Sequence, residues 1–471
     1  MARKQSVSGQ SAQQQLLRVA QNWAALHGFD ADQARELRRQ AILSNHEHYL
    51  ETIPAYKRLA YQEGIGFLDE IEPIKQHLMF PDDLFKSYNQ EWLDENNYAR
   101  MNEWLSEIHH QPVSCNVAGL STIDAWIDRL AHSGIRLVYS SGTSGNFSFV
   151  PRDAAAWELF RTASMSYLLP TLMRRKVGTG MQRLLVGLAS RFLPPDLLIR
   201  SGRNMRLPGY DAFFLDFKHG RTGNQTLEQE LGPLFRRCSF LYETDLSPSV
   251  LRLMSRGTKT HSDRDQLLAL QEVVIKRKEE NYDRLISQIK QATLDGQKVF
   301  IFGTPHLFKE LCEILSSRAD GVNLRDGSLI LFGGGWKSFS GEQISRQRLV
   351  ELMTGTLGLP LERILEGYSM TEINAFMLRC EHDRFHIPPF IEPVIFNEKL
   401  EVMEGDNIHG IFGFLDPMAT ACPGFLISGD EVHLVTGECE CGLVGPAVTE
   451  IGRAGNREVK GCGGIMASLA V

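Results

Sequence analysis

Residues 140–145, with the sequence SSGTSG, have the composition of an anion-binding loop. These six small residues follow the apolar run 135–139, and four of them carry a hydroxyl group. Closely spaced glycines let backbone N–H groups converge on anionic oxygen, and hydroxyl groups add further donors. No lysine follows the last glycine, so the segment is not the common P-loop. We interpret it as a phosphate cradle, and a plain flexible linker is the alternative that the loop alone leaves open.

Two short groups of metal-ligating residues lie near the C-terminal end of the sequence. Cys380 stands with His382 and His386 in CEHDRFH, and Cys439 stands with Cys441 in CEC. Thiolate and imidazole donors in two short groups far apart in the chain are typical of a tetrahedral zinc site. We predict that Cys380, His386, Cys439 and Cys441 hold a structural Zn²⁺, with His382 as the substitute ligand. Buried or surface residues without a metal are the alternative.

The elements that must position these residues alternate between strand and helix in the middle of the chain. Apolar spacing predicts one long helix over 263–292, a strand at 298–303, a helix over 305–315 and a helix over 343–354. A β-α-β order is typical of a largely parallel sheet with helices on its faces. After residue 388, short alternating runs predict antiparallel strands of a second sheet or a small barrel.

These patterns divide the chain into three parts. We expect a helical N-terminal region (1–108), an α/β core (109–387), and a β-rich region with a flexible C-terminal tail (388–471). Ser121 is a plausible N-cap for a helix over 122–131, just before the strand that leads into SSGTSG.

Four segments, in this order, resemble the adenylate-forming superfamily of acyl- and aryl-CoA ligases, adenylation domains and luciferases. They are SSGTSG (140–145), GYSMTE (367–372), SGD (428–430) and Gly452-Arg453. Further segments look like the acyl-protein synthetase branch, which includes the fatty-acid-activating subunit of the reductase in bacterial bioluminescence operons. These segments are PDDLFKS (81–87), FGGGWK (332–337), RFHIPPF (384–390), GFLDPMATACPGF (413–425) and EVKGC (458–462). The resemblance covers roughly residues 40–471 and is loose from 154 to 260.

The resemblance implies the large N-terminal region of the adenylate-forming fold. That region has two doubly wound α/β subdomains and a small β-rich one, to which this chain adds a helical N-terminal segment. The superfamily usually carries a further domain after the Gly-Arg segment, which rotates between half-reactions and brings a catalytic lysine. This chain stops at Val471, so we expect that rotating C-terminal domain to be absent.

The resemblance also implies a reaction. A carboxylic acid attacks the α-phosphorus of ATP to give an acyl-adenylate and pyrophosphate, and the acyl group then passes to a thiol. Thr371 would contact the α-phosphate, and Glu372 would hold Mg²⁺, a hard cation suited to carboxylate oxygen. Residues implied to cradle the β- and γ-phosphates are Ser140, Ser141, Gly142, Thr143, Ser144 and Gly145. Residues implied to contact the adenosine or its phosphate are Gly333, Gly334, Gly335, Tyr368, Asp430 and Arg453.

Two further residues could complete the chemistry. In the acyl-protein synthetases a cysteine near the C-terminus carries the acyl group, and Cys462 matches that context. Glycines at 461, 463 and 464 predict a mobile arm, on which a thiol could reach an acyl-adenylate; an incidental tail cysteine is the alternative. Lys337 is the candidate to replace the lysine of the absent domain, and a surface lysine is the alternative.

Composition and charge argue against several classes of protein. The formal net charge of −7, without long runs of Lys or Arg, argues against a nucleic-acid binder. The sequence has no run of 18 apolar residues that would span a membrane and no secretory signal, so we expect a cytoplasmic protein. We expect a ligase that uses ATP and Mg²⁺ on a carboxylic acid, such as a fatty acid, with an acyl-accepting reductase or carrier protein as partner. Two alternatives stay open: an acyl- or aryl-CoA ligase that works with a separate C-terminal domain or carrier protein, and a non-catalytic scaffold for a reductase or carrier protein.

Overall fold

The computed structural model of the protein describes the backbone of residues 2–141, 146–175, 207, 209–257, 261–318, 322–336 and 342–454. Side chains are described in the same ranges except at 2–11, 141, 255 and 256. Helices and sheets both contribute, so the predicted α/β fold class is confirmed. Within these ranges no helix is long and apolar enough to cross a membrane.

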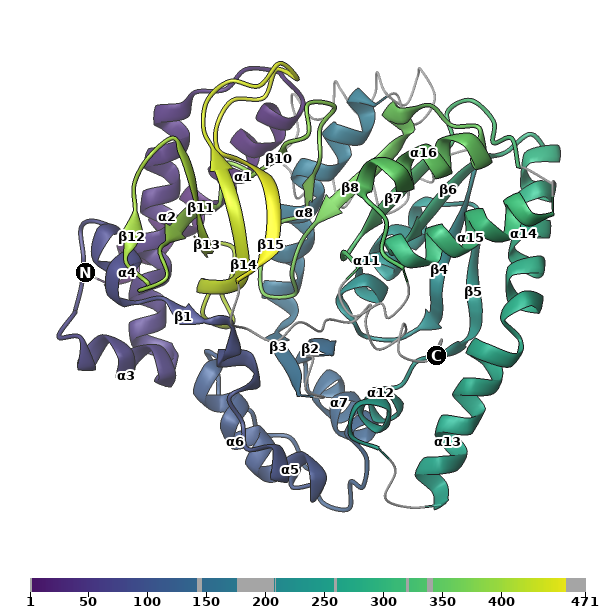
Figure 1. Cartoon of the computed structure of the whole chain (residues 1–471). Coiled ribbons are helices and arrows are strands. Elements are labelled where there is room, and N and C mark those ends of the chain that lie inside the picture. Colours follow the sequence, from purple (N-terminus) through teal and green to yellow (C-terminus); the bar gives the residue numbers. More distant parts are fainter. Residues whose placement is uncertain are drawn as a thin grey trace.

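Helices dominate the first 108 residues. α2 begins where the Asp30 carboxylate accepts hydrogen bonds from the backbone N–H groups of Asp32 (3.1 Å) and Gln33 (3.0 Å), a helix N-cap. Its buried Tyr49 packs on Phe425, with ring centroids 5.1 Å apart. In Figure 1, α1 and α2 (purple) therefore lie beside strands from the other end of the chain. The helices here are α1 (Ala2–Ala24), α2 (Ala31–Thr52), α3 (Pro54–Gln62), α4 (Glu72–His77), α5 (Gln90–Asp94) and α6 (Tyr98–Ile108).

The strands after residue 384 form an open sheet, in the order β10-β15-β14-β13-β11-β12. Neighbours along this order are antiparallel, as predicted. The sequence did not reveal a seventh strand: β1 (Phe80–Pro81) pairs with β14 in parallel, Phe80 opposite Leu426. The strands are β10 (Phe385–His386), β11 (Glu392–Phe396), β12 (Val402–Met403), β13 (Asn407–Leu415), β14 (Phe425–Val435) and β15 (Ala447–Arg453).

A six-stranded sheet forms the middle of the chain, in the order β5-β4-β6-β7-β8-β9. All pairs are parallel except β8 with β9, which confirms the predicted β-α-β arrangement. The strands are β4 (Tyr210–His219), β5 (Cys238–Asp245), β6 (Lys298–Gly303), β7 (Leu329–Gly333), β8 (Ile364–Tyr368) and β9 (Met377–Leu378). The helices that follow them include α11 (Gly223–Leu231), α12 (Pro248–Arg256), α15 (Pro305–Ser317) and α16 (Arg346–Leu357). Because carboxyl ends of parallel strands share one edge, the glycines after β7 and the loop after β8 meet there.

Three helix predictions need correction. The helix expected over 343–354 is α16 (Arg346–Leu357), which begins three residues later because Ser345 caps it. The single helix expected over 263–292 is two helices, α13 (His261–Gln271) and α14 (Lys278–Leu294), separated by a π-helical turn. The side chain of Asn281 in α14 donates to the carbonyl of Val273 in that turn (2.8 Å), a contact that periodicity cannot reveal. α7 (Ile123–His132) begins one residue later than expected, because Thr122 rather than Ser121 caps it.

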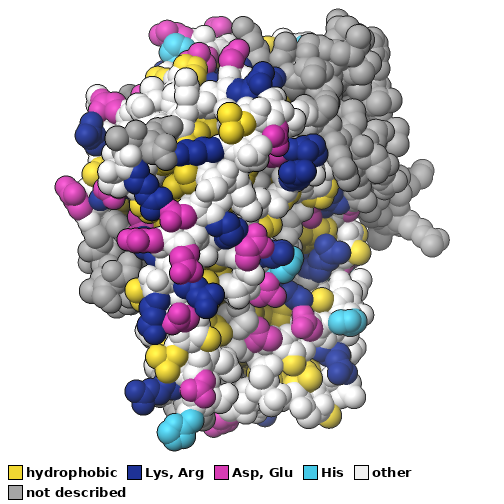
Figure 2. All heavy atoms as spheres, turned by 90° about the vertical axis from the view of Figure 1, so that its right-hand side faces the viewer, with side chains coloured by type: hydrophobic (Ala, Val, Ile, Leu, Met, Phe, Trp, Pro, Cys, Tyr) yellow, Lys and Arg dark blue, Asp and Glu magenta, His cyan; other side chains and the backbone are white. Residues whose placement is uncertain are grey.

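Charged side chains are interspersed on the face that α13 and α14 share. Figure 2 shows Lys and Arg mixed with Asp and Glu there rather than gathered by sign. Pairs such as Arg318–Asp283 and Lys276–Glu272 account for part of this pattern. A face of this kind offers no continuous positive patch for a polyanion.

A hairpin joins the N-terminal helices to the parallel sheet. Its strands are β2 (Arg136–Ser141) and β3 (Phe147–Arg152), and Tyr139 donates its backbone N–H to the carbonyl of Arg221 (3.2 Å). α8 (Ala154–Arg174) follows directly, capped by Asp153, which accepts from the N–H of Ala156 (2.8 Å). The hairpin thus places both ends of the 140–145 loop at one edge of the parallel sheet.

A buried acidic pair beside the parallel sheet should make stability depend on pH. Burial raises the pKa of Asp216 to about 6, and burial with the nearby Asp216 raises the pKa of Glu228. The folded state therefore holds protons that the unfolded state has released, so the free energy of unfolding falls as pH rises from about 4 to 6. Asp216→Asn should flatten this dependence by up to about 3 kcal/mol. Urea unfolding at pH 4 and pH 7 measures the change in the free energy of unfolding across this window. The exposed control Asp326→Asn should leave the dependence unchanged; equal pH profiles for both variants would contradict the assignment.

Candidate active site

Tyr368 and Asp430 meet although they come from different sheets. The Tyr368 hydroxyl, at the end of β8, donates to Oδ2 of Asp430 on β14 (2.8 Å). Arg453, on β15 opposite Asp430, forms an ion pair with Oδ1 (2.9 Å). Burial, followed by the charge of Asp430, raises the pKa of Tyr368 well above its ordinary value, so the phenol stays protonated and keeps donating. Three predicted residues are thereby brought together.

Glu372 connects the loop after β8 to the hairpin. One carboxylate oxygen accepts from Ser148 Oγ (2.9 Å) and the other from Thr371 Oγ1 (2.8 Å). Ser148 pairs with Ser140 across the hairpin, and Ser141 pairs with Phe147. Both stems of the predicted phosphate loop therefore lie beside Glu372.

The glycine triplet lies on the neighbouring strand end. Gly333 pairs with Gly367, and a Cβ at Gly333 would come within 2.7 Å of the Gly367 carbonyl oxygen. Gly334 and Gly335 have φ values of +85° and +63°, a backbone region that favours glycine. Strand pairing thus requires glycine at 333, and the backbone conformation favours glycine at 334 and 335.

A buried polar network behind Thr371 and Glu372 was missed by sequence reasoning. Arg152, 4% exposed, donates to the Thr371 carbonyl (2.9 Å) and to Asn374 Oδ1 (3.2 Å). The Asn374 N–H donates in turn to Asp416 (2.7 Å). Burial lowers the pKa of Arg152 and raises that of Asp416 to about 6, so each charge is costly without the other nearby. The network fixes the backbone that presents Glu372.

The sequence held a signal for this network. Arg152 ends the run Phe147–Arg152, all of which is buried, and a charge there needs a partner. Asp416 lies in the conspicuous GFLDPM segment. Neither residue identifies the other, because they come together only through the tertiary fold.

Cys380, His386, Cys439 and Cys441 lie together, as the metal prediction requires. All four are buried, and one donor atom from each lies within 4.8 Å of the others. The sulfur atoms of Cys380 and Cys439 are 3.8 Å apart, and Cys441 Sγ is 3.2 Å from His386 Nε2. A sulfur separation of 3.8 Å is far too long for a disulfide. It equals the edge of about 3.8 Å expected for a tetrahedron with Zn–S bonds of about 2.3 Å.

Backbone turns and the end of α8 hold this cluster. The Cys380 N–H donates to the Arg384 carbonyl (2.8 Å), and the Cys439 N–H to the Leu443 carbonyl (2.9 Å). Arg174, at the end of α8, donates to the Cys441 carbonyl (3.0 Å). A hydrogen bond from Cys441 lowers the pKa of the Cys380 thiol, which favours a thiolate among these donors.

The named substitute ligand, His382, lies elsewhere. Its Nδ1 is 3.5 Å from Glu440, and its side chain is 35% exposed. Gly142, Thr143, Ser144, Gly145, Lys337 and Cys462 lie outside the described residues, as does the side chain of Ser141.

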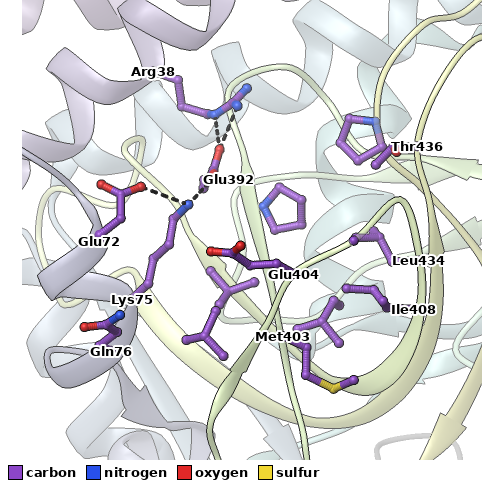
Figure 3. A pocket seen from close by; sticks show the side chains of 16 residues that line it. Arg38, Glu72, Lys75, Gln76, Glu392, Met403, Glu404, Ile408, Leu434 and Thr436 are labelled. Atoms are coloured by element: carbon purple, nitrogen blue, oxygen red, sulfur yellow. Dashed lines mark hydrogen bonds and ion pairs between the residues drawn. The ribbon is translucent and has the colours of Figure 1, made fainter.

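The cavity drawn in Figure 3 is a separate feature, of about 300 Å³, between α2, α4 and the antiparallel sheet. None of the residues predicted for the nucleotide or metal sites lines it. Glu392 occupies its charged side, paired with Arg38 (2.6 Å) and Lys75 (2.7 Å). Arg38 and Lys75 are the basic residues that line the cavity, and both pair with Glu392. Among its described lining residues the cavity therefore has no unpaired positive charge to bind an anionic nucleotide.

Comparison with known proteins adds evidence from sequence. Residues 272–470 match the family model "Acyl-protein synthetase, LuxE". A curated relative, the long-chain-fatty-acid–luciferin-component ligase of Aliivibrio fischeri, is 22% identical over 206 residues, or 43% of this chain and 54% of the relative. The chain thus spans about half the length of that relative. The resemblance to the acyl-protein synthetases predicted from the motifs is confirmed for residues 272–470.

Solved structures with a similar arrangement include an open conformation of 2-hydroxyisobutyryl-CoA ligase in complex with 2-HIB-AMP and CoA. It is 14% identical, with a TM-score of 0.48, and the match covers 90% of this chain and 71% of that one. A luciferase-like enzyme from the nonluminescent mealworm Zophobas morio is 12% identical, with a TM-score of 0.33 and coverage of 68% and 58%.

Proposed function

We propose that the protein uses ATP to convert a carboxylic acid, in the first instance a long-chain fatty acid, into an acyl-adenylate, and then passes the acyl group to a protein thiol. The observation that carries this proposal is the meeting of Glu372, Ser148 and Thr371 at the hairpin that holds the 140–145 loop. The sequence match to the acyl-protein synthetase family supports it.

In the first half-reaction, a carboxylate oxygen would attack the α-phosphorus, a P–O bond would form, and pyrophosphate would leave. Catalysis of this kind depends on positioning and on charge neutralisation. Asp430 would accept from the ribose hydroxyls while the Tyr368 hydroxyl keeps its carboxylate in place. Thr371 would donate to an α-phosphate oxygen. The carboxylate of Glu372, surrounded by hydroxyl oxygen, fits Mg²⁺, which would neutralise the phosphate charge when bound.

In the second half-reaction, a thiolate would attack the acyl carbonyl carbon and AMP would leave with the carboxyl oxygen bound to phosphorus. We propose Cys462 as this thiol, with a reductase or carrier protein as the next acceptor. We propose Lys337 as the replacement for the catalytic lysine of the superfamily's further domain, since in sequence only Trp336 separates it from the Gly333–Gly335 triplet.

Acid-dependent exchange of labelled pyrophosphate into ATP, over a panel of fatty and aromatic acids, tests the first half-reaction. The expected result is exchange that depends on long-chain fatty acids and on Mg²⁺. Calorimetry with ATP should show binding, and an absence of both ATP binding and exchange would indicate the scaffold alternative. AMP formation that requires CoA would instead indicate the CoA-ligase alternative.

We further propose that Cys380, His386, Cys439 and Cys441 bind one structural Zn²⁺. The four donors fill a tetrahedron and leave no open position for a reacting water. The cluster joins β10 to the turn before β15 and lies beside Trp23 of α1, whose ring centroid is 6.3 Å from that of His386. Zinc would thus fasten β10 to the segment before β15, and Trp23 of α1 contacts both.

Cys439→Ser should lose the zinc and lower the stability of the protein. Zinc at about 1,000 times its dissociation constant stabilises a folded protein by about 4 kcal/mol, and this contribution should disappear. Metal analysis and thermal unfolding after growth in zinc-supplemented medium measure both effects. Cys238→Ser, at an exposed cysteine far from the cluster in sequence, is the control. If wild-type protein contains no zinc and both variants are equally stable, the site is not a zinc site.

A further inference from the structure

A second cluster of metal-ligating residues lies behind Arg152 and uses no cysteine. His109 and His110 follow α6, and Asp153 caps α8. One donor atom from each of these three residues lies within 4.8 Å of the others. The nucleotide and zinc predictions use none of them, and the LuxE family match begins more than a hundred residues later.

His109 offers a nitrogen with no hydrogen-bond partner. The residue is 1% exposed, and its Nε2 atom is buried without a partner among the described residues. Its Nδ1 lies 2.8 Å from the Gln111 carbonyl oxygen and 3.2 Å from the Gln111 backbone N–H, so both tautomers find a partner there. The tautomer with the proton on Nδ1 donates to the carbonyl at the shorter distance and leaves the lone pair on Nε2. A carbonyl that accepts from Nδ1 in this way is the usual outer-shell partner of a metal-bound histidine.

His110 and Asp153 form the more open side of the cluster. His110 Nε2 is 2.8 Å from Asp153 Oδ2, and the two side chains are 15% and 21% exposed. Asp153 Oδ1 is engaged by the helix cap, so Oδ2 remains for a ligand. Two ligands of a tetrahedral ion with bonds of about 2.0–2.1 Å lie about 3.3–3.4 Å apart, so an ion would replace this 2.8 Å hydrogen bond and move the two atoms apart by about half an ångström.

The surroundings join three parts of the chain. The His110 N–H donates to the Ala421 carbonyl (2.9 Å). The ring of His48 on α2 lies 5.5 Å from that of His110, and its Nε2 is 3.0 Å from the Thr420 carbonyl. Asp153 directly follows Arg152, which holds the backbone of Thr371. An ion here would tie the segment after α6 to the start of α8, which directly follows the strand that contacts Glu372.

We propose that His109, His110 and Asp153 bind a divalent transition-metal ion, with Zn²⁺ as the first ion to test. Two imidazole nitrogens and one carboxylate oxygen suit Zn²⁺, and three protein ligands leave a position for water. This proposal does not depend on the cysteine cluster or on the proposed function. It involves other residues, and metal binding at the site is measured separately from enzyme activity.

Cobalt(II) titration of metal-free full-length protein distinguishes the two sites. Cobalt bound by cysteine gives an intense sulfur-to-metal charge-transfer band, and cobalt bound by nitrogen and oxygen gives none. We expect wild-type protein to bind one equivalent of cobalt without that band, whether or not the cysteine site loads.

Asp153→Asn should abolish the binding of the one equivalent of cobalt that gives no charge-transfer band. It should leave the thiolate charge-transfer band unchanged. The Asn oxygen can still accept from the Ala156 N–H, so the helix cap and the fold are kept. His109→Asn should have the same effect, while His77→Asn, at a half-exposed histidine paired with Glu63, should have none. If wild-type protein binds no cobalt beyond the thiolate site, or if Asp153→Asn binds as much as wild type, the proposal is wrong and His110–Asp153 is a structural pair only.

Discussion

Glu372→Gln should lower the rate of acid-dependent pyrophosphate exchange by about 10²- to 10³-fold, the loss typical of removing one key electrostatic contact. Glutamine has nearly the same shape and can still accept from Ser148 through its amide oxygen. It loses the negative charge, and with it the ligand that we assign to Mg²⁺. The rate should not recover fully at high Mg²⁺ concentration, because the amide oxygen is a weaker ligand than carboxylate.

The matched control for this experiment is Glu362→Gln, which removes an exposed carboxylate in the turn before β8. Its exchange rate should equal that of wild type. Thermal unfolding of both variants separates loss of chemistry from loss of fold. Exchange by Glu372→Gln at the wild-type rate would show that Glu372 has no part in the first half-reaction.

Cys462→Ser should abolish covalent labelling of the protein by radioactive acid and leave pyrophosphate exchange at the wild-type rate. The serine hydroxyl is not ionised at neutral pH and is a far weaker nucleophile than a thiolate. The acyl-adenylate should still form and should be recovered after denaturation as a non-covalent product. Gel electrophoresis under non-reducing conditions, followed by hydroxylamine treatment, identifies a thioester in wild type.

The exposed Cys238 provides the control, since Cys238→Ser keeps Cys462 and should label normally. Together the two variants distinguish a failure of the acceptor from a failure of activation. Equal labelling of Cys462→Ser and wild type would show that another group is the acyl acceptor. The activation step would then still be tested by pyrophosphate exchange in Glu372→Gln.

The local sequence pattern was sufficient to predict those features whose geometry depends on residue type and spacing alone. The cysteine and histidine pairs predicted a four-ligand cluster, and the structure brings these four residues together. The alternation of strands and helices predicted the parallel sheet, because buried strands and amphipathic helices have different periods. The loop after β8 and the segment around Asp430 were singled out by their motifs, and they meet at Tyr368.

Tertiary contacts determined what the sequence could not predict. The pairing of Phe80 with Leu426 joins residues more than 300 positions apart, and a two-residue strand has no periodicity to detect. In the sequence, Ser148 is one of several hydroxyl-bearing residues after residue 139, and nothing distinguishes it from the others. Only the tertiary fold brings it to Glu372. The interruption between α13 and α14 lies inside a continuous apolar pattern, so spacing alone predicted an unbroken helix.

The contacts of α1 bear on how the chain acquires its fold during synthesis. Gln13 donates to the Pro417 carbonyl (2.6 Å), and Trp23 to the Val444 carbonyl (2.7 Å). At about 5–20 residues per second, a ribosome produces these partners roughly 20–80 s after α1. Until then the part of α1 that contacts these segments lacks its final partners, although α2 and α8 already pack against the helix. Nascent chains that stop short of β15 should therefore be prone to aggregate at their beginning as well as at their end.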